Sequence, residues 1–120
     1  MKPLEIFCDA TCEGWQSTQG KAKGKIIAFI PKRNKLIEKE FEIKNTTLRQ
    51  FINRFELEAI RMGDKLSKSK NKVIYSDSQI AVGWAKKEGI NCVWLPREEN
   101  KAGQILEYGN QTNKDKVAIK

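Results

Sequence analysis

Two aspartates follow short apolar runs, at positions where an acid in an α/β protein can take part in chemistry. Asp77 follows the run 73–76 and stands directly before an apolar pattern of helical period, and Asp9 ends a run that begins at Leu4. Ligands of open α/β sheets gather just beyond the carboxyl ends of the parallel strands, so both acids are candidates for a site. A helix cap is an equally good explanation of Asp77 taken alone, and Ser78 can fill the same role.

A third acid lies within a long amphipathic pattern that predicts a helix of about five turns, beginning at Thr46 or Thr47. Its apolar positions recur every three or four residues: Leu48, Phe51, Ile52, Phe55, Ala59, Met62 and Leu66. Glu56 has isoleucines four residues before and after it, so it emerges at the edge of the buried face. Glu58 lies among arginines, which favours a solvated ion pair. Glu56 is therefore the better candidate for a site.

The elements that must position these acids form a pattern typical of a mixed α/β sheet. Apolar and β-branched runs predict five strands, over residues 4–9, 22–30, 36–43, 73–76 and 90–95. Glycines and small polar residues predict a loop over 10–23. Pro31 ends the second strand, and the alternation of the third suits a sheet edge. Gly89 ends the helix after the fourth strand, and a short helix is expected over 102–108.

The order of these elements decides which strand ends meet. Three strands joined by hairpins are followed by a helix, a strand, a helix, a strand and a helix. The right-handed crossover rule then makes the fourth and fifth strands parallel to the first, with helices packed on the sheet. The ends of the first and fourth strands lie side by side, which makes Asp9 and Asp77 neighbours. Two carboxylates in one cleft repel each other and usually need a bound cation to stay ionised together.

Composition bounds the kind of protein and its partners. The 120 residues suffice for one domain, predicted over residues 1–108, with a basic and poorly ordered tail over 109–120. A net charge of +8 and a pI near 9.5 indicate a polyanionic partner, nucleic acid first and a membrane surface second. A generically basic soluble protein is the alternative. No apolar run approaches the ~18 residues that span a bilayer.

Histidine and cysteine usage narrows the chemistry. The chain has no histidine, the commonest general base, so catalysis would fall to carboxylates, metals or thiols. Cys8, Cys12 and Cys92 are an odd count without the spacing of metal ligands. We expect reduced, mostly buried thiols, as in a cytoplasmic protein.

Four short stretches carry a further signal. They are Phe7-Cys8-Asp9-Ala10-Thr11 with Gly14; Asn53-Arg54-Phe55-Glu56-Leu57; Tyr75-Ser76-Asp77-Ser78-Gln79; and Val93-Trp94-Leu95-Pro96-Arg97-Glu98-Glu99-Asn100-Lys101. In this order they resemble the motifs of the type 1 ribonuclease H family, over about Ile6 to Leu106. The resemblance implies a single-domain protein of the ribonuclease H-like fold, an α/β fold whose five-stranded mixed sheet has the order 3-2-1-4-5 with helices on its faces. That order agrees with the one inferred from the elements.

The family resemblance also implies an activity. It implies an endonuclease that cleaves the RNA strand of RNA/DNA hybrids. We also expect a cytoplasmic monomer with no membrane partner and no inferable protein partner. The family uses two Mg²⁺ ions, with Mn²⁺ as a substitute, held by four carboxylates. Carried over residue by residue, Asp9 bridges both metals, and Glu56 and Asp77 hold the second. Two hard cations ~3.5–4 Å apart can activate a water and stabilise the leaving oxygen in an in-line displacement.

The sequence departs from the family pattern at the fourth catalytic aspartate, which Gln104 replaces, four residues after Asn100. A glutamine carbonyl can ligate a metal but carries no charge, so the water-activating ion should be held more weakly. Glu107, one helical turn further on, is the alternative ligand. Ile52 replaces the first of two asparagines with which the family meets nucleic acid, and the loop before the last helix lacks the histidine of some members.

Two alternatives to the hydrolase follow from these departures. One is a binding module of the same fold, catalytically weak because of Gln104, that holds hybrid or structured nucleic acid. The other is a resolvase-like nuclease of this fold that acts on DNA.

The resemblance assigns substrate contacts to Thr11, Asn53 and Gln79. A hybrid-binding surface needs cations for phosphates and small polar groups for the minor groove and the 2′-hydroxyls. All three residues lie within three positions of a candidate acid, which agrees with such a role. A plain helix-start role is the alternative for Asn53 and Gln79.

The three tryptophans divide by their surroundings. Trp15, in the predicted loop, is a candidate for stacking on sugar or base. Trp84 and Trp94 fit apolar patterns and are expected in the core. The basic run 68–72 is a weaker candidate for phosphate contact, because such runs are usually solvated.

Overall fold

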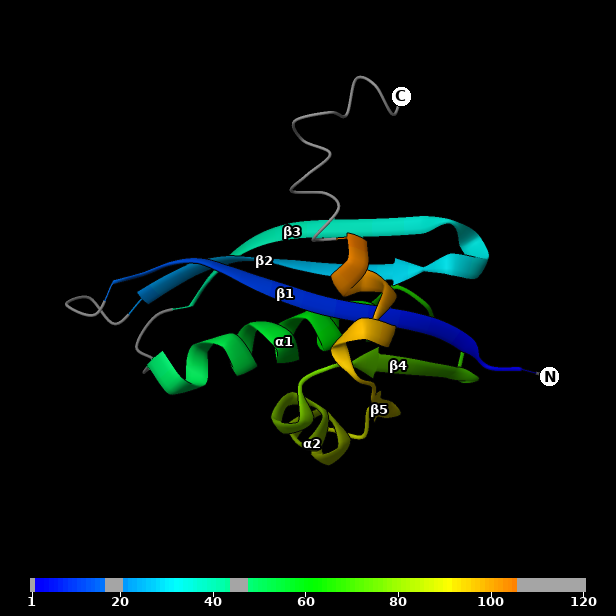
Figure 1. Ribbon diagram of the computed structural model, residues 1–120. Helices are drawn as coiled ribbons and strands as arrows, with labels where there is room; N and C mark the ends of the chain where they lie inside the picture. The colour runs from blue at the N-terminus through cyan, green and yellow to red at the C-terminus, as the bar shows by residue number, and fades with distance from the viewer. Residues whose placement is uncertain (1, 17–20, 44–47, 106–120) are drawn as a thin grey trace, which may run out of the picture.

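A five-stranded mixed sheet in the order β3-β2-β1-β4-β5 organises the molecule (Figure 1). This computed structural model describes residues 2–16, 21–43 and 48–105. The strands are β1 (Leu4–Gln16), β2 (Lys21–Ile30), β3 (Lys35–Ile43), β4 (Lys72–Ser76) and β5 (Cys92–Trp94). The helices are α1 (Leu48–Lys65) and α2 (Gln79–Lys87), with the 3-10 helices η1 (Pro31–Arg33) and η2 (Arg97–Glu99). The strand order is the predicted one, and the predicted tail over 109–120 lies outside the described residues.

The direction of each strand follows from the connection that precedes it. Hairpins join β1 to β2 and β2 to β3, and both pairs are antiparallel. Helical crossovers lead into β4 and β5, and these strands pair in parallel, β4 with β1 and β5 with β4. The described residues 101–105 are helical, inside the stretch where a last helix is predicted.

The first hairpin is longer than predicted. The loop expected over 10–23 is wrong, because β1 pairs with β2 as far as Gln16, which lies opposite Lys21. The register shifts between Cys12 and Gly14, where a bulge accommodates an extra residue. Glycine within a strand often marks such a bulge, and in the sequence alone the same residue is equally typical of a loop.

The two faces of the sheet carry separate apolar clusters. Phe55 and Ile60 of α1 pack with Ile6 of β1 in the larger cluster, to which α2 also contributes. Phe7, the next residue along β1, points to the other face and packs with Ala102. In Figure 1 the orange segment that contains Ala102 crosses β1 on the face away from α1. The last segment of the described chain therefore closes the sheet from the second side.

Local signals set both ends of α2. The Ser78 hydroxyl oxygen accepts a hydrogen bond from the Ala81 N–H at 3.1 Å, which makes Ser78 the N-cap. Gly89, at a φ of 82°, follows the helix in the left-handed conformation that glycine adopts most readily. Ser78 and not Asp77 therefore caps α2, which leaves the interpretation of Asp77 as a site residue.

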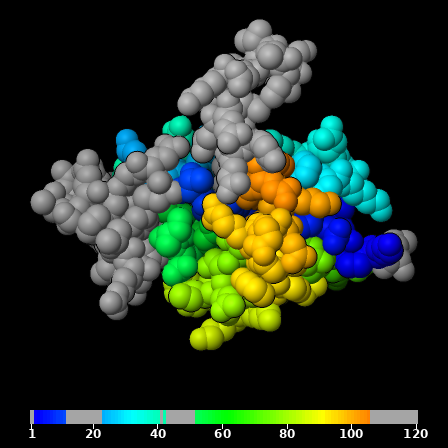
Figure 2. All heavy atoms as spheres, in the orientation of Figure 1, coloured from blue at the N-terminus to red at the C-terminus, as the bar shows by residue number. Residues whose placement is uncertain are grey.

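Burial separates the two tryptophans that were expected in the core. Trp84 is partly buried and packs against the main cluster, as predicted. The prediction for Trp94 is wrong, because its side chain is 41% exposed. Figure 2 shows the segment 90–105, in yellow and orange, on the molecular surface beside residues of the N-terminal strand.

Two smaller expectations can also be compared with the structure. Cys8 and Cys92 are buried and form no disulfide, as expected, and the side chain of Cys12 lies outside the described set. Among the residues that the structure describes, no helix is long and apolar enough to cross a membrane.

Candidate metal centre

Three carboxylates from three elements meet at one edge of the sheet. Asp9 lies on β1, Glu56 on α1, and Asp77 directly after β4, and one oxygen of each lies within 4.8 Å of the others. The register explains the first contact: Phe7 pairs with Tyr75, so Asp9 and Asp77 both stand two residues beyond a paired position on adjacent parallel strands. The structure thus brings together the three acids on which the sequence prediction depends.

Helix α1 delivers the third acid from the main core. Phe55 and Ala59 are fully buried against the sheet, and Glu56 lies between them in sequence with a side chain only 5% exposed. Its Oε1 accepts a hydrogen bond from the Ala10 N–H at 3.0 Å, and its Oε2 accepts one from the Ser76 hydroxyl at 3.4 Å. These two donors belong to β1 and β4, so they hold the carboxylate over the seam between the two strands.

Asp9 is the most enclosed of the three acids. Its side chain is 1% exposed, and among the described residues its Oδ1 has no hydrogen-bond partner. A buried carboxylate oxygen without a donor is costly, because it has lost its hydration and gained nothing in return. The surroundings of Asp9 Oδ1 therefore favour the binding of a cation at this oxygen.

The pKa values of Asp9 and Glu56 also indicate that negative charge is unfavourable at this centre. Burial raises the pKa of Asp9 from 3.8 to about 6, and the nearby charge of Asp77 acts in the same direction. Burial also raises the pKa of Glu56 well above its ordinary value, with the charge of Asp9 as the second cause. Removing water from carboxylates and placing like charges together both disfavour ionisation. A divalent cation among the three acids would reverse this effect.

Asn100 ties the last helical segment to the centre. Its side chain is fully buried, and its Nδ2 donates to the Cys8 carbonyl at 2.9 Å and to Asp77 Oδ2 at 3.2 Å. Its Oδ1 accepts a hydrogen bond from the Ala102 N–H at 3.1 Å, as an N-cap does. The sequence places Asn100 in a motif but gives it no such role, because Cys8 and Asp77 are remote from it in sequence.

The position that faces the acids from this segment is Gly103. A Cβ built on Gly103 would lie 2.9 Å from Asp9 Oδ2 and 3.8 Å from Asp77 Oδ2. Gly103 is absent from the predicted site residues, although glycine costs ~1 kcal/mol against alanine inside a helical pattern and so calls for a reason there. The last segment can therefore touch the centre only because this residue has no side chain.

Of the two candidate fourth ligands, the structure describes Gln104, and it does not bring this residue to the cluster. The Gln104 side chain is exposed, and its Nε2 donates to the Glu98 carbonyl at 2.9 Å, within its own segment. Glu107 lies outside the described residues. Among the residues that the structure describes, the acids of the centre are thus Asp9, Glu56 and Asp77.

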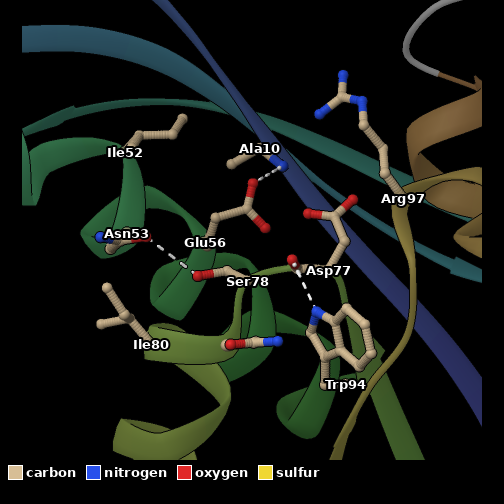
Figure 3. Close-up of a pocket in the computed structure, with 10 residues that line it drawn as sticks. Ala10, Ile52, Asn53, Glu56, Asp77, Ser78, Ile80, Trp94 and Arg97 are labelled. Carbon is tan, nitrogen blue, oxygen red and sulfur yellow. Dashed lines mark hydrogen bonds between the residues drawn. The ribbon is translucent and has the colours of Figure 1, made fainter.

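A pocket of about 500 Å³ opens beside the acids and contains two of the predicted substrate contacts, Asn53 and Gln79 (Figure 3). The side-chain Oδ1 of Asn53 accepts a hydrogen bond from the Ser78 hydroxyl at 3.1 Å. The orientation of the Asn53 side chain is therefore linked to the N-cap of α2. Thr11 is partly exposed on β1, outside the wall of this pocket. The side chain of Trp15 lies outside the described set.

The same pocket has walls that the sequence did not predict. In Figure 3, Ile52 and Ile80 lie on one side of Glu56 and Asp77, and Trp94 and Arg97 on the other. Arg97 is close enough for its positive charge to lower the pKa of Asp9 slightly, against the larger effect of burial. The pocket therefore combines an acidic floor with apolar sides and one cation.

Comparison with known proteins identifies the fold. No family model matches the chain, and no curated protein matches its sequence. Among solved structures, the N-terminal RNase H domain of a Mycobacterium tuberculosis protein, solved as a fusion with maltose-binding protein, superposes with a TM-score of 0.51 at 14% identity, over 92% of this chain and 99% of that chain. RNase H1 from Halobacterium salinarum gives a TM-score of 0.49 at 12% identity, over 82% and 89% of the two chains.

LC11-RNase H1, solved in complex with an RNA/DNA hybrid, gives a TM-score of 0.47 at 21% identity, over 82% of this chain and 88% of that chain. The sheet order and the first superposition agree on one architecture. The chain has the ribonuclease H-like fold.

Proposed function

We propose that this protein is a metal-dependent endonuclease that hydrolyses the RNA strand of RNA/DNA hybrids, with divalent cations held by Asp9, Glu56 and Asp77. The observation that carries the proposal is the meeting of these three carboxylates, from β1, α1 and the end of β4, within 4.8 Å of one another. Like charges are costly in so small a volume unless a cation binds among them.

The residues present fit a hard divalent cation. All candidate ligands are carboxylate oxygens, and the chain has no histidine, so Mg²⁺ or Mn²⁺ suits the centre better than Zn²⁺. The buried Asp9 Oδ1, which has no partner among the described residues, is the donor atom that most needs an ion. The raised pKa values of Asp9 and Glu56 express the same cost of negative charge without a counter-ion.

The protein's own groups hold these ligands in place for the reaction. Ala10 and Ser76 each donate a hydrogen bond to Glu56, and Asn100 donates one to Asp77. Such outer contacts orient the ligand oxygens and reduce the reorganisation that ion binding requires. Asp9, Glu56 and Asp77 would hold such ions, which would supply activation of a water and stabilisation of the leaving oxygen in an in-line phosphodiester displacement.

The proposed substrate rests on three further supports. The net charge of +8 favours a polyanion, and Asn53 and Gln79 place amide groups in the pocket beside the acids, where minor-groove edges and 2′-hydroxyls can be recognised. The motif resemblance selects the RNA strand of a hybrid among the nucleic acids of this class. The ribonuclease H-like fold is compatible with that choice.

A digestion panel tests the proposal. The protein is incubated with an RNA/DNA hybrid, duplex DNA and junction DNA of matched sequence, in Mg²⁺ and separately in Mn²⁺. We expect cleavage of the RNA strand alone, lost in Glu56→Gln and retained in Glu58→Gln, a matched change two residues away on the same helix. Glu58 is a fair control because it forms an ion pair with Arg61 outside the centre. An intact hybrid in both metals would refute the proposal, and cleavage of junction DNA instead would favour the resolvase-like alternative.

One observation favours a second candidate function, a binding module of weak or no activity. The segment that carries Asn100 presents Gly103 to the acids, and the Gln104 amide donates to Glu98 instead. A centre with three carboxylates holds two divalent ions less tightly than one with four. Salt-dependent hybrid binding without turnover in either metal would support this candidate.

A further inference from the structure

Trp94 is a large aromatic side chain exposed at the pocket of the acidic centre. Its side chain is 41% exposed and lines the same pocket as Glu56 and Asp77. Tryptophan is highly buried on average, because exposing its large apolar surface to water is costly. A tryptophan left open beside a functional centre therefore indicates a binding surface.

The exposure follows from where Trp94 stands along β5. Cys92 and Trp94 point to the same face of the sheet, and Cys92 is buried in the cluster that includes Ala85 of α2. Trp94 pairs with Ser76, level with the end of β4, and α2 begins only at Gln79. The side chain has thus passed the part of the helix that covers Cys92, and it faces the pocket.

The ring is held in a defined orientation. Its Nε1–H donates to the Asp77 backbone carbonyl at 3.1 Å, and the Leu95 N–H donates to the Ser76 carbonyl at 2.9 Å. Both bonds tie this end of β5 to the strand that delivers Asp77. A ring fixed in this way loses little conformational freedom on binding a ligand, which favours affinity.

The opposite side of the pocket is also apolar and exposed. Ile80, at the start of α2, is 53% exposed, and Ile52 of α1 lies near it across the acids from Trp94 (Figure 3). A pocket of about 500 Å³ with apolar groups on two sides, Arg97 beside Trp94 and an acidic floor suits a single flat group next to a charged one. A nucleotide has this character, because an apolar base face is joined to a phosphate.

We propose that Trp94 stacks on an unpaired base next to the phosphodiester at the acidic centre, so that the protein prefers hybrids whose hybrid region borders a single strand. The faces of a paired base are covered by its neighbours in the stack, whereas an unpaired base offers its whole face to an aromatic ring. This inference rests on the proposed function and names the form of substrate that the same centre selects.

Binding measured in EDTA, where no cleavage takes place, tests this inference. The probes are a blunt RNA/DNA hybrid and the same hybrid carrying a single-stranded RNA extension, each followed by fluorescence anisotropy. We expect the extended probe to bind more tightly, and Trp94→Ala and Trp94→Leu to lose about 5- to 150-fold of affinity for it, as stacking on one base contributes. The blunt probe should be affected by less than about threefold, and the slope of affinity against salt should not change, because no charge is removed.

Conservative and control variants separate stacking from a structural role. Trp94→Phe keeps an aromatic face and should retain most of the preference for the extended probe, although it loses the hydrogen bond to Asp77. Trp84→Phe changes a tryptophan of the core cluster and should leave the preference intact. Quenching of tryptophan emission by the extended probe should be smaller in Trp94→Phe than in the parent protein and Trp84→Phe.

Equal binding of both probes by the parent protein, or a preference that survives in Trp94→Ala and Trp94→Leu, would overturn the inference. Its failure differs from failure of the proposed function. Cleavage of hybrids without the preference removes the role of Trp94 alone, whereas the preference without cleavage in Mg²⁺ or Mn²⁺ removes the nuclease alone.

Discussion

Glu56 and Glu58 lie two residues apart on helix α1, and their electrostatic surroundings are opposite. Glu58 pairs with Arg61, which also binds Glu88 of the neighbouring segment, and the guanidinium lowers the pKa of Glu88. Glu56 faces Asp9 and Asp77, and burial raises its pKa. Arg61 thus supplies an ion-pair partner to Glu58 and Glu88, whereas the positive charge of Arg97 near Asp9 does not offset the effect of burial on the pKa of that acid. The proposed cation-binding role therefore belongs to Glu56 and its neighbours Asp9 and Asp77.

The largest expected effect comes from removing the charge at the middle of the buried group. Asp9→Asn should lower hybrid cleavage by on the order of 10²–10³-fold or more, because an electrostatic group at the reacting centre is lost. The same variant should be no less stable than the parent protein in EDTA, since it removes a buried negative charge whose Oδ1 has no hydrogen-bond partner among the described residues. Cleavage rates and thermal melts measure the two effects, and a large loss of stability in EDTA would contradict the comparison.

Cation binding itself should distinguish the two groups of acids. At Mg²⁺ concentrations near 100 times the dissociation constant, binding to the folded state stabilises it by about 2.7 kcal/mol. For a domain of this size that corresponds to a rise in Tm of roughly 10 °C. Calorimetry should show this rise in the parent protein and in Glu58→Gln, and little of it in Glu56→Gln. An equal rise in all three would place the ion elsewhere.

Without metal, the dependence of stability on pH should reflect the raised pKa of Asp9. The folded-state pKa of Asp9 is about 6 against an ordinary 3.8, so the folded state binds a proton more tightly than the unfolded state does. The tighter binding of this proton stabilises the folded state by about 3 kcal/mol in total. This stabilisation is fully present below pH ~4 and is lost as the pH rises through about 6. The unfolding free energy of the parent protein minus that of Asp9→Asn, measured in EDTA, should decrease as the pH rises from 4 to 7. Saturating Mg²⁺ should abolish the fall.

The smallest expected effects come from substitutions at Gly103 and Gln104, two adjacent residues of the last segment, and they should differ in size. Gly103→Ala places a methyl group 2.9 Å from Asp9 Oδ2, and such crowding costs about 1–3 kcal/mol of stability and should reduce cleavage about tenfold. Gln104→Asp should change Mg²⁺ affinity and cleavage by less than about threefold, because the Gln104 amide donates to Glu98 away from the acids. A large gain of Mg²⁺ affinity in Gln104→Asp would show that position 104 reaches the centre.

The acidic centre could be predicted because its residues follow from periodicity and topology. Strand ends are visible as changes of pattern, and the handedness of crossovers then determines which ends meet. These two rules are enough to make Asp9 and Asp77 neighbours. The helical period is equally informative for Glu56, because it separates this acid from the solvated face that carries Glu58.

The rest of the pocket could not be predicted, because it depends on contacts between segments rather than on local pattern. Trp94 fits a strand pattern equally well whether α2 covers it or begins one turn too late, and only the relative position of β5 and α2 decides. Gly103 matters through the distance of its backbone from Asp9, which no local pattern encodes. In the first hairpin Gly14 has two meanings, loop or bulge, and strand pairing selects the bulge.

Asn100 has a consequence for motion as well as for geometry. One side chain caps the helical segment that begins at Lys101, holds the Cys8 carbonyl and donates to Asp77. Local opening of proteins proceeds in cooperative units, and a helix end that frays opens with little cost in free energy. Fraying of this segment would break its cap and release the Asp77 carboxylate in the same event. A local opening of this short helix would thereby change the affinity of the centre for the proposed cation.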